Sequence, residues 1–445
     1  MTGTVGLEGK GAEGGRSTDA PGARDGSKEA LLVPRRRVRV LFINDTSRNG
    51  GPGRSLFSIL KFLDPAVVHR TVVLPRDGVI SELLLEGGVA DHLFYEKDFV
   101  ENPFEPAHRA MERGDFDAPW PLKAGRLAVN VGRATRGFVS LASAIRRGAF
   151  DLLYCNGTNA DFAGGLLSAM TGVPALWHAR YTSVPALTVP THRRLAASPG
   201  VRRIVCVSQA VANLFDHCAD KVRVIHNAVD LESFDPAAIQ PTLRKEMGWS
   251  PETVVFGSQG RILPRKGYVE MIQAARLAVD KLSSEEKARV RFAVVGDTPA
   301  DIHPDHLVEC RRLVDELGLR DVFCFTGFRA DVKPCVADFD VTVVPSTYAD
   351  PLPRAVIEGM ALGKPVVAFN VGGVGEMLAD GQTGTLVSGT PADIPAMADA
   401  FLRYIRDPAL RIAQGRLGRR RIEEHFDGRS HGRQIQNQIV SASGL

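Results

Sequence analysis

The sequence of 445 residues contains no run of about 18 apolar residues, the length that a membrane-crossing helix needs. Its six cysteines form no C-x-x-C pair, which argues against a structural zinc site or a disulfide framework and favours reduced, buried thiols. The 55 basic and 51 acidic residues give a formal net charge of only +4, so we do not expect nucleic acid as a partner. These absences leave a globular protein whose chemistry must be sought in local motifs.

Large apolar side chains are scarce in residues 1–34, which are rich in glycine, alanine and charge. The segment has no apolar centre of the kind that a signal peptide carries. We interpret residues 1–34 as a disordered tail. We expect the protein to be cytoplasmic, with the inner face of the membrane as an alternative place of action.

From residue 38 onward, short apolar runs alternate with longer helix-like stretches. Most of the runs are continuous rather than alternating, as in parallel strands that are covered by helices on both faces. The strand–helix–strand repetition predicts a doubly wound α/β fold. The predicted strands fall into two series, 38–43, 70–74, 151–155, 173–177, 203–207 and 222–225, then 254–258, 290–295, 322–326, 340–344, 365–369 and 384–387.

Two series of strands predict two Rossmann-like domains, at residues 35–235 and 253–420. Residues 236–252, with three prolines and few apolar residues, are predicted to link them. We expect residues 421–445 to form a C-terminal helix or tail that packs back on the N-terminal domain. Open α/β sheets bind ligands outside the carboxyl ends of their strands, so we expect a ligand-binding cleft between the domains.

Acidic residues are absent from 121–150, a stretch that carries six basic ones. Its apolar residues are spaced as on one face of a helix: Leu127, Val131, Phe138, Leu141 and Ile145. One interpretation is an ordinary surface helix with a solvated basic side. The other is peripheral contact with a membrane surface or with an anionic acceptor.

Two glycine-containing or basic turns follow predicted strands. Gly50 and Gly51 follow the first strand and precede an apolar helix, where backbone N–H groups can approach an anionic ligand closely. This turn matches neither the G-x-G-x-x-G fingerprint nor a Walker loop. Arg261 and Lys266 follow the first strand of the second series, where they could clamp two phosphates or simply form a basic surface turn.

A third motif places two carboxylates eight positions apart. Asp350 is predicted in a loop and Glu358 on the helix that follows it. One acid could then reach a sugar while the other reaches a ribose of the same nucleotide. The alternative is that Asp350 caps the helix and Glu358 is a solvated helical residue.

These motifs together resemble the retaining glycosyltransferases of the GT-B fold, family 4, also called glycosyl transferases group 1. The family's acid pair matches Asp350 and Glu358, and its Gly-x-Pro-Val-Val stretch matches residues 363–367. Its Gly-Arg-Leu…Lys-Gly pattern matches residues 260–262 and 266–267. The resemblance covers about residues 38–426 and is more specific over the second half than over the first.

The resemblance implies a role for each matching residue. Arg261 and Lys266 would hold the donor diphosphate, and Glu358 would bind the nucleotide ribose. Asp350 and the backbone amides after it, including that of Leu352, would contact the donor sugar. Gly50 and Gly51 would approach the sugar or phosphates from the first half. His178, at the end of a strand, matches the family's histidine near the reacting carbon, although a strand-end histidine with ordinary structural partners is the alternative.

The implied activity is transfer of a sugar from a nucleotide-diphosphate-sugar to an acceptor with retention of configuration. No D-x-D pair follows a strand, and cations and helix N-termini would stabilise the leaving diphosphate, so we expect no cofactor and no required metal. Asp350 is one methylene shorter than the family's usual glutamate, and Pro353 replaces a common glycine, which removes an N–H donor. Both departures concern recognition of the donor sugar.

Two alternatives share the fold. One is a non-catalytic protein that binds a nucleotide sugar, and the other is a sugar-nucleotide epimerase that needs no acceptor. For a transferase, a polysaccharide, a lipid-linked glycan and a small metabolite all remain open as acceptors.

Overall fold

The computed structural model describes residues 31–47, 50–98, 120–299 and 305–445, and residues 31–445 form one compact unit. The predicted tail, residues 1–34, lies outside the described residues except for 31–34. Side chains at 120–124, 126 and 127 are outside them too, so Leu127 and two of the basic residues of 121–150 are not placed.

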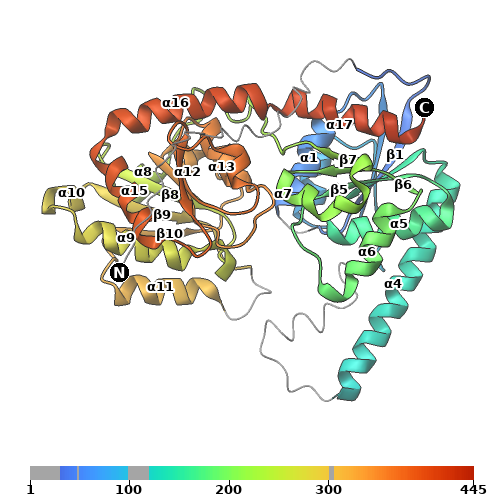
Figure 1. Ribbon diagram of the computed structural model, residues 1–445, viewed down its shortest axis with the longest axis horizontal. Coiled ribbons are helices and arrows are strands. Elements are labelled where there is room, and N and C mark those ends of the chain that lie inside the picture. The colour runs from blue at the N-terminus through green and yellow to red at the C-terminus, as the bar shows by residue number, and fades with distance from the viewer. Residues whose placement is uncertain (1–30, 48–49, 99–119, 300–304) are drawn as a thin grey trace, which may run out of the picture. The chain divides into compact units, whose positions relative to one another are not determined.

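The first half of the described chain builds one parallel sheet, ordered β3-β2-β1-β4-β5-β6-β7 among the described strands (Figure 1). The order runs outward in both directions from β1 and β4, which makes the fold doubly wound. Its strands are β1 (Val38–Asn44), β2 (Val68–Leu74), β3 (His92–Tyr95), β4 (Leu152–Asn156), β5 (Ala175–Ala179), β6 (Val201–Cys206) and β7 (Val222–Val224).

The second half repeats this plan with the order β10-β9-β8-β11-β12-β13 among the described strands, again parallel. Here the strand order reverses between β8 and β11. The strands are β8 (Val254–Gln259), β9 (Val290–Val295), β10 (Phe323–Gly327), β11 (Val341–Val344), β12 (Val366–Asn370) and β13 (Gly384–Ser388).

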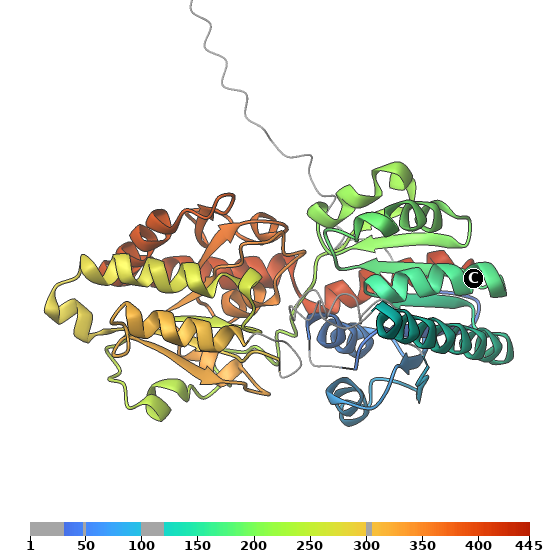
Figure 2. The same cartoon turned by 90° about the horizontal axis from the view of Figure 1, so that it is seen from below.

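Helices cover both faces of each sheet (Figure 2). Within the first half they are α1 (Gly51–Phe62), α2 (Val79–Glu86), α4 (Trp120–Gly148), α5 (Thr158–Thr171), η2 (Ala186–Thr188), α6 (Val189–Ala197), α7 (Gln209–Ala212) and η3 (Asn213–Lys221). The remainder are α8 (Leu243–Met247), η4 (Pro264–Lys266), α9 (Tyr268–Asp280), α10 (Ser284–Ala288), α11 (His306–Glu316), α12 (Lys333–Ala337), α13 (Arg354–Ala361), α14 (Val374–Met377), α15 (Ile394–Arg406), α16 (Pro408–His425) and α17 (Gly428–Ser443). None of the described helices has the length and apolarity to cross a membrane.

Successive residues of β1 point to opposite faces of the sheet, and both faces are buried. Val40 and Phe42 belong to one apolar cluster with residues of α1 and α17, whereas Leu41 and Ile43 belong to another with residues of α4 and α5. Burial on both faces requires an apolar residue at every position, which is why the sequence shows continuous rather than alternating runs.

The C-terminal helix α17 returns to the first sheet. Helix α16 lies along the second half and ends at His425, and Asp427 then caps α17 by accepting a hydrogen bond from the Ser430 amide at 2.8 Å. Ile435 and Ile439 of α17 are fully buried in the cluster that contains Leu56 and Ile59 of α1. The last helix of the chain is therefore part of the first hydrophobic core.

The chain crosses between the two halves at two places that lie side by side. Val229, after β7, donates a backbone hydrogen bond to Phe426 at 3.0 Å and accepts one from Gly428 at 2.8 Å. Residues 236–252 contain helix α8, whose Arg244 forms ion pairs of 2.7 Å with Asp338 and 2.6 Å with Asp340. That segment is thereby attached to the second sheet.

The prediction of a doubly wound α/β fold with two parallel sheets is confirmed, and each of the twelve predicted strands overlaps an observed one. Strand β3 was not predicted. It has four residues, lies at the sheet edge, and none of its side chains is fully buried, so its sequence carries little of the apolar signal that marks the other strands.

Candidate active site

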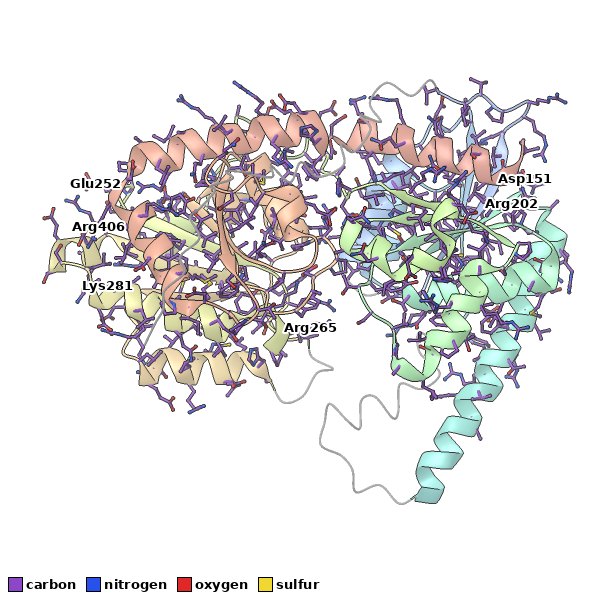
Figure 3. All side chains as sticks on the ribbon, in the orientation of Figure 1. Asp151, Arg202, Glu252, Arg265, Lys281 and Arg406 are labelled. Atoms are coloured by element: carbon purple, nitrogen blue, oxygen red, sulfur yellow. The ribbon has the colours of Figure 1, made fainter. Side chains whose placement is uncertain are left out.

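A cavity of about 600 Å³ opens at the carboxyl ends of strands from both sheets. Its lining includes residues that directly follow β5, β8, β9 and β11 and residues of the loop after β1, which is where open α/β sheets place their ligands. Figure 3 shows the polarity of the second half: Arg265, which follows β8 and lines the cavity, lies at the opposite end from Glu252, which precedes β8. The volume of the cavity is within the usual range for small-molecule sites.

The structure brings seven of the eight predicted site residues into this one lining. They come from segments as far apart in sequence as the turn before α1 and the helix α13: Gly50, Gly51, Arg261, Lys266, Asp350, Leu352 and Glu358. The glycines lie where the loop after β1 meets α1, and the cations lie in the loop after β8. Asp350 lies in the loop before α13, and Glu358 lies on α13 itself. Sequence motifs from both halves thus share one cavity.

Lys266 and Asp350 form an ion pair on the cavity wall. The Lys266 Nζ donates to Asp350 Oδ2 at 2.7 Å, and the Tyr348 hydroxyl donates to the same oxygen at 2.9 Å. Gly267 makes this approach feasible: its φ is +74°, and a Cβ there would lie 1.7 Å from the Pro345 carbonyl oxygen. Only glycine tolerates both the left-handed backbone and that contact.

Two arginines extend the basic wall beside Lys266. Arg261 and Arg265 are exposed on the loop after β8. The Arg265 guanidinium lies 5.1 Å from the ring centre of Tyr348, and the Lys266 ammonium lies 5.3 Å from it. Tyr348 therefore supports two of the three cations through its ring. Burial, as the largest cause, raises the pKa of its hydroxyl, which remains a neutral hydrogen-bond donor.

Glu358 is held on one side of the cavity by two neighbours. Gln259, the last residue of β8, donates to Oε2 at 2.6 Å, and Arg354, one turn earlier on α13, donates to Oε1 at 3.0 Å. The Glu358 side chain is 12% exposed. Pro353 precedes the helix and also lines the cavity, so position 353 offers no N–H donor there.

His178, the eighth predicted residue, does not line the cavity. It belongs to β5 and is fully buried, and its Nδ1 accepts hydrogen bonds from the Tyr154 hydroxyl and from Arg180, the latter at 3.3 Å. Burial, the largest cause, holds its pKa well below the usual value, so the ring is neutral. Two residues farther along, the chain reaches the cavity with Arg180 instead.

Sequence reasoning missed the site roles of Arg180, Arg354 and Asn227, which all line the cavity. The Arg180 Nε donates to Asn156 at 2.8 Å and its Nη1 to Asn227 at 2.5 Å. The available signals were weak: Arg180 stands two residues after a strand-end histidine, and Arg354 stands four residues before Glu358, on the same helical face.

Carboxylates, thiols and imidazoles do not gather into a metal site: no group of three or more His, Cys, Asp or Glu in the described residues could hold an ion. The expectation that neither cofactor nor metal is required stays a prediction.

Two doubly wound sheets with a shared cavity at their carboxyl ends form the GT-B architecture, and solved structures of that class match. HepE of Anabaena, in complex with UDP and glucose, aligns with a TM-score of 0.71 at 23% identity, covering 90% of this chain and 98% of that one. A sucrose-phosphate synthase of Thermosynechococcus elongatus aligns with a TM-score of 0.67 at 19% identity, covering 90% and 97%. At such identities these matches show the fold alone.

Sequence comparisons identify the family. Residues 106–233 match the model described as Glycosyltransferase Family 4, and residues 239–421 match Glycosyl transferases group 1. The alpha-D-kanosaminyltransferase of Streptomyces kanamyceticus is 31% identical over 283 residues, which is 58% of this chain and 68% of that protein. The chain belongs to the group 1, family 4 glycosyltransferases. The resemblance to that family is thus confirmed, while retention of configuration stays untested.

The alignments with other curated relatives are shorter. A D-inositol 3-phosphate glycosyltransferase of Streptomyces avermitilis is 29% identical over 313 residues, 65% of each protein. That of Kribbella flavida is 34% identical over 212 residues, 47% of each. The matched region spans less than two thirds of these relatives.

Proposed function

We propose that this protein transfers a sugar from a nucleotide-diphosphate-sugar to a carbohydrate or lipid-linked acceptor, with retention of configuration. One observation carries the proposal: Arg261, Lys266, Asp350 and Glu358 line the same cavity. A cavity with cations along one wall and with one buried and one partly buried carboxylate fits a ligand that is anionic at its centre and rich in hydroxyl groups at its ends.

Charge separation is the difficult part of such a transfer. The diphosphate leaves as an anion while the sugar becomes cation-like. Arg261 and Lys266 would stabilise the developing anion, which is usually the largest contribution to catalysis. Because this pair supplies the positive charge, we expect turnover without a metal ion.

The two carboxylates would orient the rest of the donor. Glu358, already held by Gln259 and Arg354, would accept hydrogen bonds from the ribose hydroxyls. Asp350 and the backbone amide of Leu352 would contact the sugar, and Lys266 would then be shared between Asp350 and the phosphates. Gly50 and Gly51 would approach from the first half, where the acceptor is expected.

Retention requires the acceptor to attack from the face that the leaving group vacates. We assign no covalent nucleophile, because Asp350 is engaged by Lys266 and Tyr348. For His178 we propose a positioning role, since its neutral Nδ1 accepts a hydrogen bond from Arg180 at the cavity wall.

The test is a donor screen followed by turnover. UDP-, GDP-, ADP- and TDP-sugars are compared by thermal shift, since a ligand that binds only the native state raises Tm. Hydrolysis or transfer is then measured with the stabilising donor. Arg261→Ala and Lys266→Ala should each lower turnover at least about 100-fold. The matched control is Arg312→Ala, an exposed α11 arginine paired with Glu316 and outside the cavity lining.

Unchanged turnover in both variants would contradict the proposed mechanism. Binding without hydrolysis or transfer would instead indicate a non-catalytic nucleotide-sugar-binding protein. Conversion of the donor to another nucleotide sugar with no acceptor present would indicate an epimerase.

We also propose a peripheral contact of residues 121–150 with an anionic membrane surface. Within α4, Val129, Val131 and Val139 are 62%, 45% and 59% exposed, beside basic residues. Leu141 and Ile145 are buried against the first sheet, so the C-terminal part of α4 serves the core. Co-sedimentation with phosphatidylglycerol vesicles, but not with phosphatidylcholine vesicles, is the expected result. Equal recovery in both pellets would leave α4 as an ordinary surface helix.

A further inference from the structure

Two arginines of the cavity wall received no role from the sequence motifs. Arg180 follows β5 in the first sheet, and Arg354 begins α13 in the second half, yet both line the same cavity. Burial is the largest cause that lowers the pKa of Arg180, to about 10, and the positive charge of Arg354 lowers it as well. The two arginines therefore lie within electrostatic reach of each other.

Arg180 has only neutral partners. Its Nε and Nη1 donate to the side-chain oxygens of Asn156 and Asn227, and its Nη2 donates to His178. Across the described residues, no carboxylate lies within salt-bridge distance of it. These partners fix the guanidinium plane without neutralising it. Three of its five N–H groups are used, which leaves one N–H on each Nη nitrogen as a donor for a carboxylate or a phosphate.

Arg354 is paired but incompletely satisfied. Its Nε and Nη2 lie 3.0 and 2.9 Å from Glu358 Oε1, while its Nη1 is buried and has no hydrogen-bond partner among the described atoms. A buried guanidinium nitrogen without an acceptor costs free energy that an incoming oxygen would recover.

Asp161, a fully buried carboxyl, lies within electrostatic reach of Arg180, but burial, the largest cause, raises the pKa of Asp161 well above its usual value and so favours its neutral form. His431 of α17 is 5% exposed, and neither of its ring nitrogens has a partner among the described residues. Burial first, then the charges of Arg180 and Arg354, lower the pKa of His431 to about 3, so it is neutral. The described cavity lining as a whole has seven arginines and lysines against three acids, Asp297, Asp350 and Glu358.

We propose that Arg180 and Arg354 form a second anion subsite, separate from the diphosphate-binding pair Arg261 and Lys266, for a carboxylate or phosphate carried by one of the two substrates. This inference rests on the proposed function, because it presumes that Arg261 and Lys266 are occupied by the donor diphosphate. Asn156 and Asn227 act as positioning residues for the Arg180 fork. The substrate class is accordingly an acidic sugar nucleotide or a phosphorylated acceptor.

The deciding experiment uses inorganic phosphate as the probe. The full-length protein is saturated with the nucleoside diphosphate that gives the largest thermal shift, and phosphate is then titrated against sodium chloride of equal ionic strength. In the nucleotide-saturated wild type, phosphate should raise Tm in a saturable manner, and sodium chloride should not. Arg180→Gln should weaken phosphate binding at least about tenfold while nucleotide affinity changes less than about threefold. Arg354→Met should weaken phosphate binding by a similar factor and nucleotide affinity by a clearly smaller one, because Arg354 also holds Glu358.

The matched control is Arg312→Met, which removes an arginine that is paired with a glutamate four residues later, as Arg354 is, but on α11 and outside the cavity lining. It should leave phosphate binding unchanged. Since Arg180→Gln deprives two asparagines of their partner, Arg354→Met decides the question if Arg180→Gln lowers Tm on its own.

Three results separate the hypotheses. Absence of a phosphate effect on the nucleotide-bound wild type overturns the second subsite and leaves the proposed function standing. An equal loss of nucleotide and phosphate affinity in Arg354→Met also overturns it, because Arg354 would then serve the diphosphate. Failure of every nucleoside diphosphate to bind overturns the proposed function itself, and the second subsite with it.

The source of the anion follows from a second titration. Phosphate is added to wild type saturated with a sugar nucleotide that carries either a neutral hexose or the corresponding uronic acid. If only the uronic acid blocks phosphate, the donor carries the acidic group. If phosphate binds beside both, the subsite belongs to the acceptor, and hexose phosphates should compete for it where the parent hexoses do not.

Discussion

The ammonium of Lys266 lies 2.7 Å from a carboxylate oxygen of Asp350, and the two side chains are 21% and 8% exposed. The pair joins the loop after β8 to the loop after β11, so the same contact that supports the fold also places a cation beside the expected diphosphate. Its two roles can be separated by substitution.

Lys266→Met should lower the free energy of unfolding by about 1–3 kcal/mol, because it leaves the mostly buried Asp350 carboxylate with the Tyr348 hydroxyl as its remaining side-chain partner among the described residues. The double variant Lys266→Met/Asp350→Asn removes the unpaired charge and should recover most of that stability. Neither variant should recover nucleotide affinity. Urea unfolding and calorimetric titration measure the two effects, and a double variant as unstable as the single one would contradict this account.

Gly267→Ala should be far more costly than an equivalent change at another left-handed glycine. Gly318, after α11, has φ +64° and open space where a Cβ would stand, whereas a Cβ at Gly267 would overlap the Pro345 carbonyl. We expect Gly267→Ala to destabilise by at least about 2 kcal/mol more than Gly318→Ala. Equal midpoints in urea would show that the loop relaxes without cost.

Ile435→Ala should destabilise the protein by about 2–4 kcal/mol, since Ile435 is fully buried between α17 and the first sheet. Ile412 on α16 is 56% exposed, and Ile412→Ala should cost less than about 0.5 kcal/mol. Chemical denaturation of both variants measures the difference. A small effect at Ile435 would mean that α17 is loosely attached.

Because the Glu376 carboxylate accepts hydrogen bonds, the protein should become less stable in acid. Burial would raise its pKa, but hydrogen bonds from His226 and from the Gln209 and Ala210 amides outweigh it and lower the pKa below the usual value. A carboxyl with a lowered folded-state pKa stabilises the fold above its unfolded pKa, about 4.3, and that contribution is lost as pH falls through the folded value.

The free energies of unfolding of wild type and Glu376→Gln should therefore differ at pH 7 and converge as the pH falls below about 4. Glu316→Gln on the exposed side of α11 is the control and should differ little from wild type throughout. A constant gap between wild type and Glu376→Gln from pH 7 to pH 3.5 would contradict the assignment.

Much of this architecture can be predicted from the sequence, because a parallel strand that is covered by helices on both faces needs an apolar residue at every position. Val40 to Ile43 illustrate this, since each of the four enters a buried cluster. Strand β3 lies at an edge with partly exposed side chains, so the same rule does not apply to it. Short motifs likewise indicate Lys266, Asp350 and Glu358, because the three residues lie near the ends of neighbouring strands, the first two in loops and Glu358 on the helix that follows.

Contacts between distant segments could not be predicted in this way. Arg180 and Arg354 are 174 positions apart and line the same cavity only because two sheets share it. His178 has the sequence context of a site residue, but it lies inside β5, where its ring packs with Tyr154 in the interior. The chain reaches the cavity only after the strand ends, at Arg180. The position at which β5 ends decides which of these two residues lines the cavity, and the sequence does not fix that position.

The paired crossings at Val229 and Asp427 have a mechanical consequence. The two backbone stretches lie side by side and are joined by hydrogen bonds from Val229 to Phe426 and from Gly428 to Val229. Together they define a hinge axis between the two halves. A movement of one sheet against the other that preserves both bonds is a rotation about that line. Residues near the line, such as Asn227, would be displaced least, and those on the far rim of the cavity would sweep the longest arc.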